Sequence, residues 1–251
     1  SSAPLTELRA LVRSGSLGGV VLMDVAQGDE REKMLLEERI PTVLIGSSGL
    51  SGGTPCVDTD FAQMAHAAVS HLADLGHRRV IALMRETAHD DSHARQDQAR
   101  ELLRAADDLG MDVLVHQVPE LALAGSDVVG AGGLVEGCTA VISNNPAACM
   151  GLACAAHAHG LSVPADLSVL TLGVTEYRGR QGEAFSELSV DRQAMGTAAG
   201  SLLLARLRGI PAPSEHSALI PAVLTDHGST ARCQDQPEPA RSLSALSAPR
   251  A

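Results

Sequence analysis

Short apolar segments alternate with longer amphipathic ones along most of this 251-residue chain. Several short segments are almost continuously apolar, as in strands whose two sheet faces are both covered by helices. The longer segments carry apolar residues at helical spacing. This alternation predicts an α/β fold built on parallel, doubly wound sheets. The predicted strands are residues 19–23, 42–45, 79–84, 112–117, 140–143, 167–172 and 218–224.

The predicted helices end at residues that commonly stop helices. Gly76, Gly110 and Gly160 follow three of them, in the position where a left-handed residue closes the last turn. Pro41 ends another, because the residue before a proline disfavours the helical region. The predicted helices are residues 29–39, 61–75, 94–109, 146–159 and 193–207.

Charge and aromatic content argue against nucleic-acid binding by this chain itself. Its net charge is −11, and its 19 lysines and arginines form no basic cluster of the kind that binds phosphates. The chain has no tryptophan, one tyrosine and two phenylalanines, so it lacks the stacking platforms typical of single-strand binders.

The chain also lacks the signature of a membrane or disulfide-rich protein. No run approaches the roughly 18 apolar residues that a membrane span needs. Its five cysteines are odd in number and include no C-x-x-C pair, which favours free thiols in a reducing compartment. We therefore expect a cytoplasmic protein with no membrane partner.

Several segments match one set of family motifs in the right order and at the right spacing. The most specific segment, residues 71–80, reads HLADLGHRRV, and residues 160–169 read GLSVPADLSV. Three others are IPTVLIG at 40–46, TAVISNN at 139–145 and GST at 228–230. Over about residues 5–232 the chain resembles the effector-binding core of LacI/GalR-type transcription regulators.

The resemblance implies two Rossmann-like lobes of the periplasmic-binding-protein type. The first lobe would comprise residues 1–77 and the helix at 193–208. The second would comprise residues 78–187 and a strand at about 218–226. Residues 233–251 are rich in Pro, Ser and Ala, which predicts a disordered tail.

The family's helix-turn-helix head, hinge helix and first strand–helix–strand unit have no counterpart here. We therefore expect an N-terminally truncated first lobe, short of its central strand and with exposed apolar edges. The resemblance implies a small-molecule effector, most commonly a carbohydrate, bound between the lobes. It also implies a homodimer that contacts DNA only through the missing head.

A solute-binding protein and an enzyme are the two alternative classes of function. An extracytoplasmic solute-binding protein would have the same fold, but the LGHRR segment favours the regulator branch. An enzyme is not expected, because no nucleophile–base pair or phosphate-binding loop occurs in a suitable context. No cofactor and no metal site are predicted.

Asn144 and Asn145 follow a predicted strand and precede Pro146, which opens a helix. Ligands of parallel sheets bind at such strand ends, and side-chain amides there can bind hydroxyl groups. The family's corresponding pair contacts the effector. Asn145 is alternatively the N-cap of the helix, and both roles can coexist.

The loop and helix start at residues 85–98 supply further candidates. Residues 89–93 read HDDSH, and a solvated loop explains this stretch better than a metal site does. We expect Ser92 or His93 to form a hydrogen bond with a ligand rather than to bind a metal ion. Gln98 stands where the resemblance places an effector-binding arginine. Arg95 lies one helical turn earlier and is an alternative anchor.

Gly173 stands where the family carries an acidic effector ligand. Gln63 and Asp60, at the start of the helix 61–75, are additional ligand candidates, although Asp60 is equally suited to cap that helix. The exchanges at Gln98 and Gly173 predict either an unusual effector or none.

Overall fold

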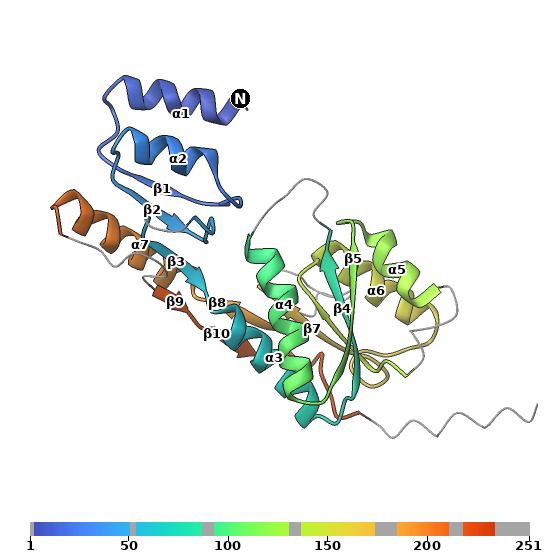
Figure 1. The fold of residues 1–251 in the computed structure, drawn as a ribbon. Coiled ribbons are helices and arrows are strands. Elements are labelled where there is room, and N and C mark those ends of the chain that lie inside the picture. Colours follow the sequence, from blue (N-terminus) through green and yellow to red (C-terminus); the bar gives the residue numbers. More distant parts are fainter. Residues whose placement is uncertain are drawn as a thin grey trace, which may run out of the picture.

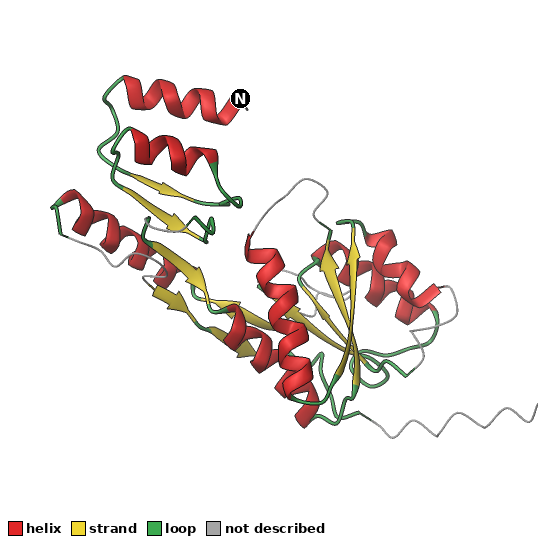
Figure 2. Cartoon of the chain, in the orientation of Figure 1, coloured by secondary structure: helices red, strands yellow, loops and turns green. Residues whose placement is uncertain are grey.

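A computed structural model describes residues 3–50, 54–86, 93–130, 137–173, 185–210 and 218–233. It has two sheets, each covered by helices on both faces, which confirms the predicted α/β fold with two lobes (Figures 1 and 2). The sheet of the first lobe is parallel, with strand order β1-β2-β3-β9. Its strands are β1 (Val20–Leu22), β2 (Thr42–Ile45), β3 (Cys56–Thr59) and β9 (Ala218–Ile220).

The sheet of the second lobe has the order β10-β8-β7-β6-β4-β5. Its strands are parallel except for β10, which pairs antiparallel with β8. The strands are β4 (Arg79–Arg85), β5 (Asp112–Val118), β6 (Ala140–Ser143), β7 (Ser168–Leu172), β8 (Ser186–Val190) and β10 (Ala222–Thr225).

Three helices cover the first sheet. Helices α1 (Ala3–Arg13) and α2 (Glu30–Glu37) pack on one face, and α7 (Arg192–Leu207) packs on the other. Alternate residues of β2 serve the two faces, because successive strand side chains point in opposite directions: Leu44 lies in the α1–α2 cluster and Val43 in the α7 cluster. Strand β1 forms an exposed apolar edge, with Val21 and Met23 36% and 58% exposed.

Four helices cover the second sheet. Helices α3 (Phe61–Asp74) and α4 (His93–Asp108) pack with Val80 and Ala82 of β4 on one face. Helix α6 (Pro146–Ala158) packs with Ile81 and Leu83 on the other face, beside α5 (Ala122–Gly130). None of the helices in the described part of the chain is long and apolar enough to cross a membrane.

The expected lobe boundaries are wrong in two places. Helix α3 was placed in the first lobe, but its apolar stripe, including Ala68 and Leu72, is buried in the core of the second. The single strand expected at 218–224 is two strands, β9 in the first sheet and β10 in the second. Pro221 separates them, because proline has no N–H with which to continue a strand ladder.

The predicted helix and strand ranges omitted four elements, α1, β3, β8 and α5. It also placed Cys233 in a disordered tail, but the Cys233 N–H donates to the carbonyl of Leu75 at 2.8 Å. Residues 234–251 lie outside the described residues.

The chain crosses between the lobes three times, from β3 to α3, from β8 to α7 and from β9 to β10. The first two crossings leave from the carboxyl ends of β3 and β8. The carboxyl ends of both sheets therefore face the junction between the lobes. The Asp60 N–H donates to the carbonyl of Ile220 at 2.9 Å, so two of the crossings are joined where they pass.

Candidate functional site

The carboxyl edge of the second sheet is the candidate site. Strands β4, β6 and β7 end at or next to Arg85, Asn144 and Gly173, so these residues share one edge. Ligands of open parallel sheets bind outside the carboxyl ends of the strands, where connections diverge. Here the same edge faces the other lobe.

A hydrogen-bonded pair of amide side chains lies at the centre of this edge. The Asn144 Nδ2 donates to Gln98 Oε1 at 2.6 Å, and Asn144 Oδ1 accepts from the backbone N–H of Arg85 at 2.8 Å. Gln98 is 8% exposed, and in the described part of the chain its Nε2 donates to the sulfur of Met64 alone, at 3.5 Å. The structure thus brings together two of the predicted site residues, Asn144 and Gln98.

Asn145 has the capping role expected for it, and its side chain bonds within the protein. Its side chain is fully buried, and Oδ1 caps α6 by accepting from the Ala148 N–H at 3.2 Å. Its Nδ2 donates to the carbonyls of Val118 and Pro119, each at 3.1 Å. These bonds occupy the amide and hold the end of β5 against the start of α6.

Asp60 and Gln63 also form hydrogen bonds within the protein. Asp60 caps α3, and its Oδ1 accepts from the Gln63 N–H at 2.9 Å. The Gln63 side chain pairs with the backbone of Ala222 in both directions, donating to its carbonyl at 3.1 Å and accepting from its N–H at 2.9 Å. Both residues therefore hold the crossings between the lobes.

The remaining predicted residues add little to the described site. Gly173 ends β7 with a φ of +70°, and a Cβ built there would meet no atom within 4 Å. His93 and Arg95 lie in the first turn of α4, whereas Ser92 lies outside the described residues. In the described part of the chain no group of three or more His, Cys, Asp or Glu residues is placed to hold a metal ion.

Arg85 is a site residue that sequence reasoning missed. Its Nη2 forms an ion pair with Glu120 Oε1 at 3.0 Å, and its Nε is buried without a hydrogen-bond partner. The predicted strand ended at residue 84, one residue short of the observed end of β4. The signal in the sequence was a charged residue, Arg85, directly after the apolar run of the strand.

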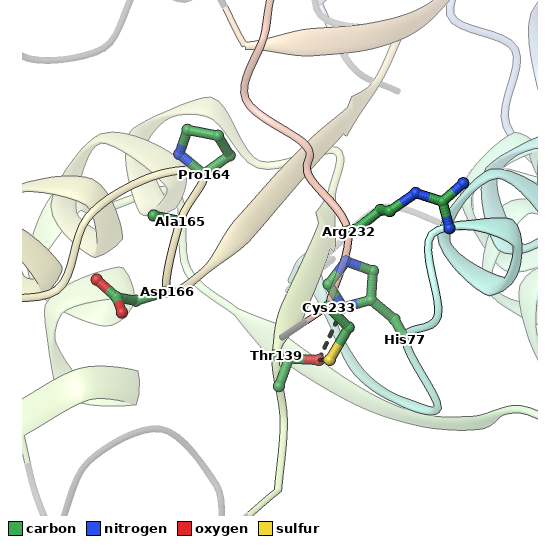
Figure 3. A pocket seen from close by; sticks show the side chains of 7 residues that line it. All are labelled: His77, Thr139, Pro164, Ala165, Asp166, Arg232 and Cys233. Carbon is green, nitrogen blue, oxygen red and sulfur yellow. Dashed lines mark hydrogen bonds between the residues drawn. The ribbon is translucent and has the colours of Figure 1, made fainter. Parts of the chain in front are cut away.

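The opposite, amino-terminal edge of the second sheet carries a small polar pocket (Figure 3). His77 lies there, 2% exposed, with Nδ1 2.7 Å from Thr139 Oγ1 and Nε2 3.1 Å from both Ser168 Oγ and the Ala231 carbonyl. Because a carbonyl only accepts, Nε2 carries the proton and Nδ1 accepts from Thr139. A neutral imidazole satisfies these contacts.

Acidification is expected to weaken the fold through His77. Burial lowers the pKa of His77 below the ordinary value of 6.5, and nearby His71 adds to the effect, while the bond to the Ala231 carbonyl opposes it. Below pH 6.5 the unfolded chain takes up a proton that the folded chain resists. The stabilisation is therefore present above that pH and is lost as the pH falls from 6.5 through the folded-state pKa.

The measurement is urea unfolding at pH 7.5 and pH 5.5 for the wild type and for His77→Gln, which has no titrating ring. The midpoint is expected to fall more steeply on acidification in the wild type than in the variant. Equal pH dependence of the two proteins would show that His77 does not carry the effect.

Of the five cysteines, Cys56, Cys138 and Cys149 are buried. Burial raises the pKa of Cys149 to about 11, so its thiol stays protonated and unreactive. This thiol is a packing group beneath the site.

A family model for the periplasmic-binding-protein-like domain matches residues 69–230. A curated relative, an uncharacterised HTH-type transcriptional regulator from Streptomyces limosus, is 26% identical over 205 residues. The match covers 79% of this chain and 58% of the relative, so the chain spans less than two thirds of that protein's length.

Solved structures share the fold. A LacI family transcriptional regulator from Bifidobacterium animalis superposes with a TM-score of 0.81 at 21% identity, over 93% of this chain and 85% of that one. A LacI family regulator from Enterococcus faecium, solved with bound ribose, superposes with a TM-score of 0.70 at 18% identity, over 92% and 85% of the two chains.

Proposed function

Because this chain belongs to the periplasmic-binding-protein-like domain family, we propose that it is of the LacI type and binds a small polar effector of the carbohydrate class between its two lobes. In this proposal the chain is the sensing core of a transcription regulator. A DNA-binding head and a second copy of the chain complete the active form.

The observation that carries the proposal is the Asn144–Gln98 pair at the carboxyl edge of the second sheet. Amide groups held at strand ends that face another lobe suit a ligand with several hydroxyl groups. The ribose bound in the Enterococcus faecium regulator supports the same class of ligand.

The three crossings supply the link between binding and regulation. A ligand that contacts both lobes binds their closed arrangement better than the open one and therefore shifts the population toward closure. The change in lobe arrangement would then alter the spacing of the DNA-binding heads in the dimer.

The test is the ligand-dependent thermal shift of Asn144→Ala, measured with a panel of neutral sugars. The variant loses the amide that positions Gln98 and the Arg85 backbone, and we expect its affinity for any stabilising sugar to fall about tenfold, the effect of one or two hydrogen bonds. Gln193→Ala is the control, because Gln193 is an exposed amide on α7. Unchanged affinity in Asn144→Ala would place the site elsewhere.

A further inference from the structure

We infer that the ligand of this site carries an anionic oxygen group, a carboxylate or a phosphate, which Arg85 binds in place of Glu120. The inference rests on the proposed function, since it names the chemical class of ligand that the same site would take. Two observations support it: donors without strong acceptors at this edge of the sheet, and the ion pair between Arg85 and Glu120.

The polar groups left under-used at this edge are donors. Both oxygens of the amide pair already accept one hydrogen bond, since Asn144 Oδ1 accepts from the Arg85 N–H and Gln98 Oε1 accepts from Asn144. Among the described residues, the buried Nε of Arg85 has no hydrogen-bond partner, and Gln98 Nε2 donates to the weakly accepting sulfur of Met64. A complementary ligand therefore presents oxygen acceptors rather than donors.

The guanidinium of Arg85 is held in position but is not committed to one partner. Its backbone is fixed to Asn144, and its side chain contacts Glu120 through Nη2 alone, at 3.0 Å. The two side chains are 30% and 46% exposed, and an ion pair in such a position contributes little stability. If the guanidinium turns away from Glu120 so that the buried Nε becomes accessible, a ligand oxyanion would engage both Nε and Nη2, the two-pronged contact that Glu120 does not make here.

Glu86, Asp97 and Glu120 are described acidic residues near this cluster. Glu120 is the counter-ion to be exchanged, and the carboxylate of Asp97 pairs with Arg100 at 2.6 Å. Glu86, the residue after Arg85, is exposed to solvent, where its charge is screened by water. Gly173 at the end of β7 carries no side chain, and a Cβ there would meet open space.

The experiment compares matched probes by thermal shift and titration calorimetry on the 251-residue chain: glucose, gluconate, glucose 6-phosphate and inorganic phosphate. We expect gluconate or glucose 6-phosphate to bind at least tenfold more tightly than glucose, as charge-assisted hydrogen bonds require. Gluconate and glucose 6-phosphate distinguish the carboxylate from the phosphate. Inorganic phosphate shows whether the anion suffices without the sugar.

Arg85→Gln is expected to remove the preference for the anionic probe, whereas Glu120→Gln is expected to strengthen its binding severalfold by removing the competing carboxylate. Arg79→Gln is the matched control, because Arg79 pairs with Asp112 at 2.9 Å between the same two strands at their other ends. That control also tests whether loss of a β4–β5 ion pair alone affects binding.

The outcomes separate this inference from the proposed function. If glucose binds as well as its anionic counterparts and Arg85→Gln changes neither, the anion inference is overturned while sugar binding stands. If no probe of either kind binds, both fail. Loss of the anionic preference in Arg85→Gln but not in Arg79→Gln supports the inference.

Discussion

Replacing Gly151 by alanine is expected to lower the free energy of unfolding by about 3 kcal/mol or more, or to prevent folding, which exceeds most single core substitutions. Gly151 lies where α6 meets α5, and a Cβ built on it would overlap the backbone carbonyl of Ala122. The contact is reciprocal, because a Cβ on Gly125 would overlap the carbonyl of Ala148. Neither overlap involves a flexible side chain, so only separation of the two helices would relieve it.

Urea unfolding of Gly151→Ala beside Gly196→Ala provides the measurement. Gly196 lies within α7, and a Cβ there would meet no atom within 4 Å. Alanine at that position is expected to stabilise the protein by up to about 1 kcal/mol, since glycine is a poor helix former. If the two variants unfold alike, the close helix contact is not essential.

Asn145→Ala is expected to cost about 3 kcal/mol of stability, because it removes a helix cap and one of the two donors to each of the Val118 and Pro119 carbonyls. The side chain has no exposed surface, and it donates to the carbonyls of Val118 and Pro119. The cap to Ala148 is lost in the same variant. Urea unfolding would measure the combined loss of free energy from the cap and from the bonds to the two carbonyls.

Asn145→Ser separates the two contributions, because a serine hydroxyl still caps a helix but does not reach both carbonyls. It is expected to recover about 1 kcal/mol relative to alanine, the typical value of a cap. Asn144→Ala, one residue away, is expected to lose ligand affinity with a smaller loss of stability. A reversed order of stability between the alanine variants at positions 144 and 145 would contradict these roles.

Most elements were predictable because their patterns are local. The strand at 42–45 and the strand at 140–143 match the observed bounds, since continuous apolar runs identify buried strands. Helix α5 was missed because ALAGSDVVG has no polar face and two glycines, which argue against a helix in isolation. Packing against α6 stabilises it instead. Strand β8 was missed because SELSV is short and half polar.

The candidate site was predictable only in part. The strand-end rule placed Asn144 at the correct edge, but nothing in the sequence indicated that its amide bonds to Gln98, 46 residues away. Asp60, Gln63 and Asn145 are polar residues at similar positions, yet their side chains are used within the protein. Which polar group remains available depends on neighbours that are distant in sequence.

The alternation of short apolar runs with amphipathic segments was enough to determine the α/β class, because each strand and helix is selected by its own periodicity. The two-lobed architecture was implied by the resemblance of several motifs to the LacI/GalR family. The tertiary structure alone decided which lobe each element joins. Helix α3 has one apolar stripe, and that stripe fits either sheet in principle; it is buried on the second because β10 and α4 enclose it there. Likewise, two apolar runs around Pro221 look like one strand until two different sheets provide their hydrogen-bond partners. Periodicity is a local property, whereas lobe membership depends on contacts between segments far apart in the chain.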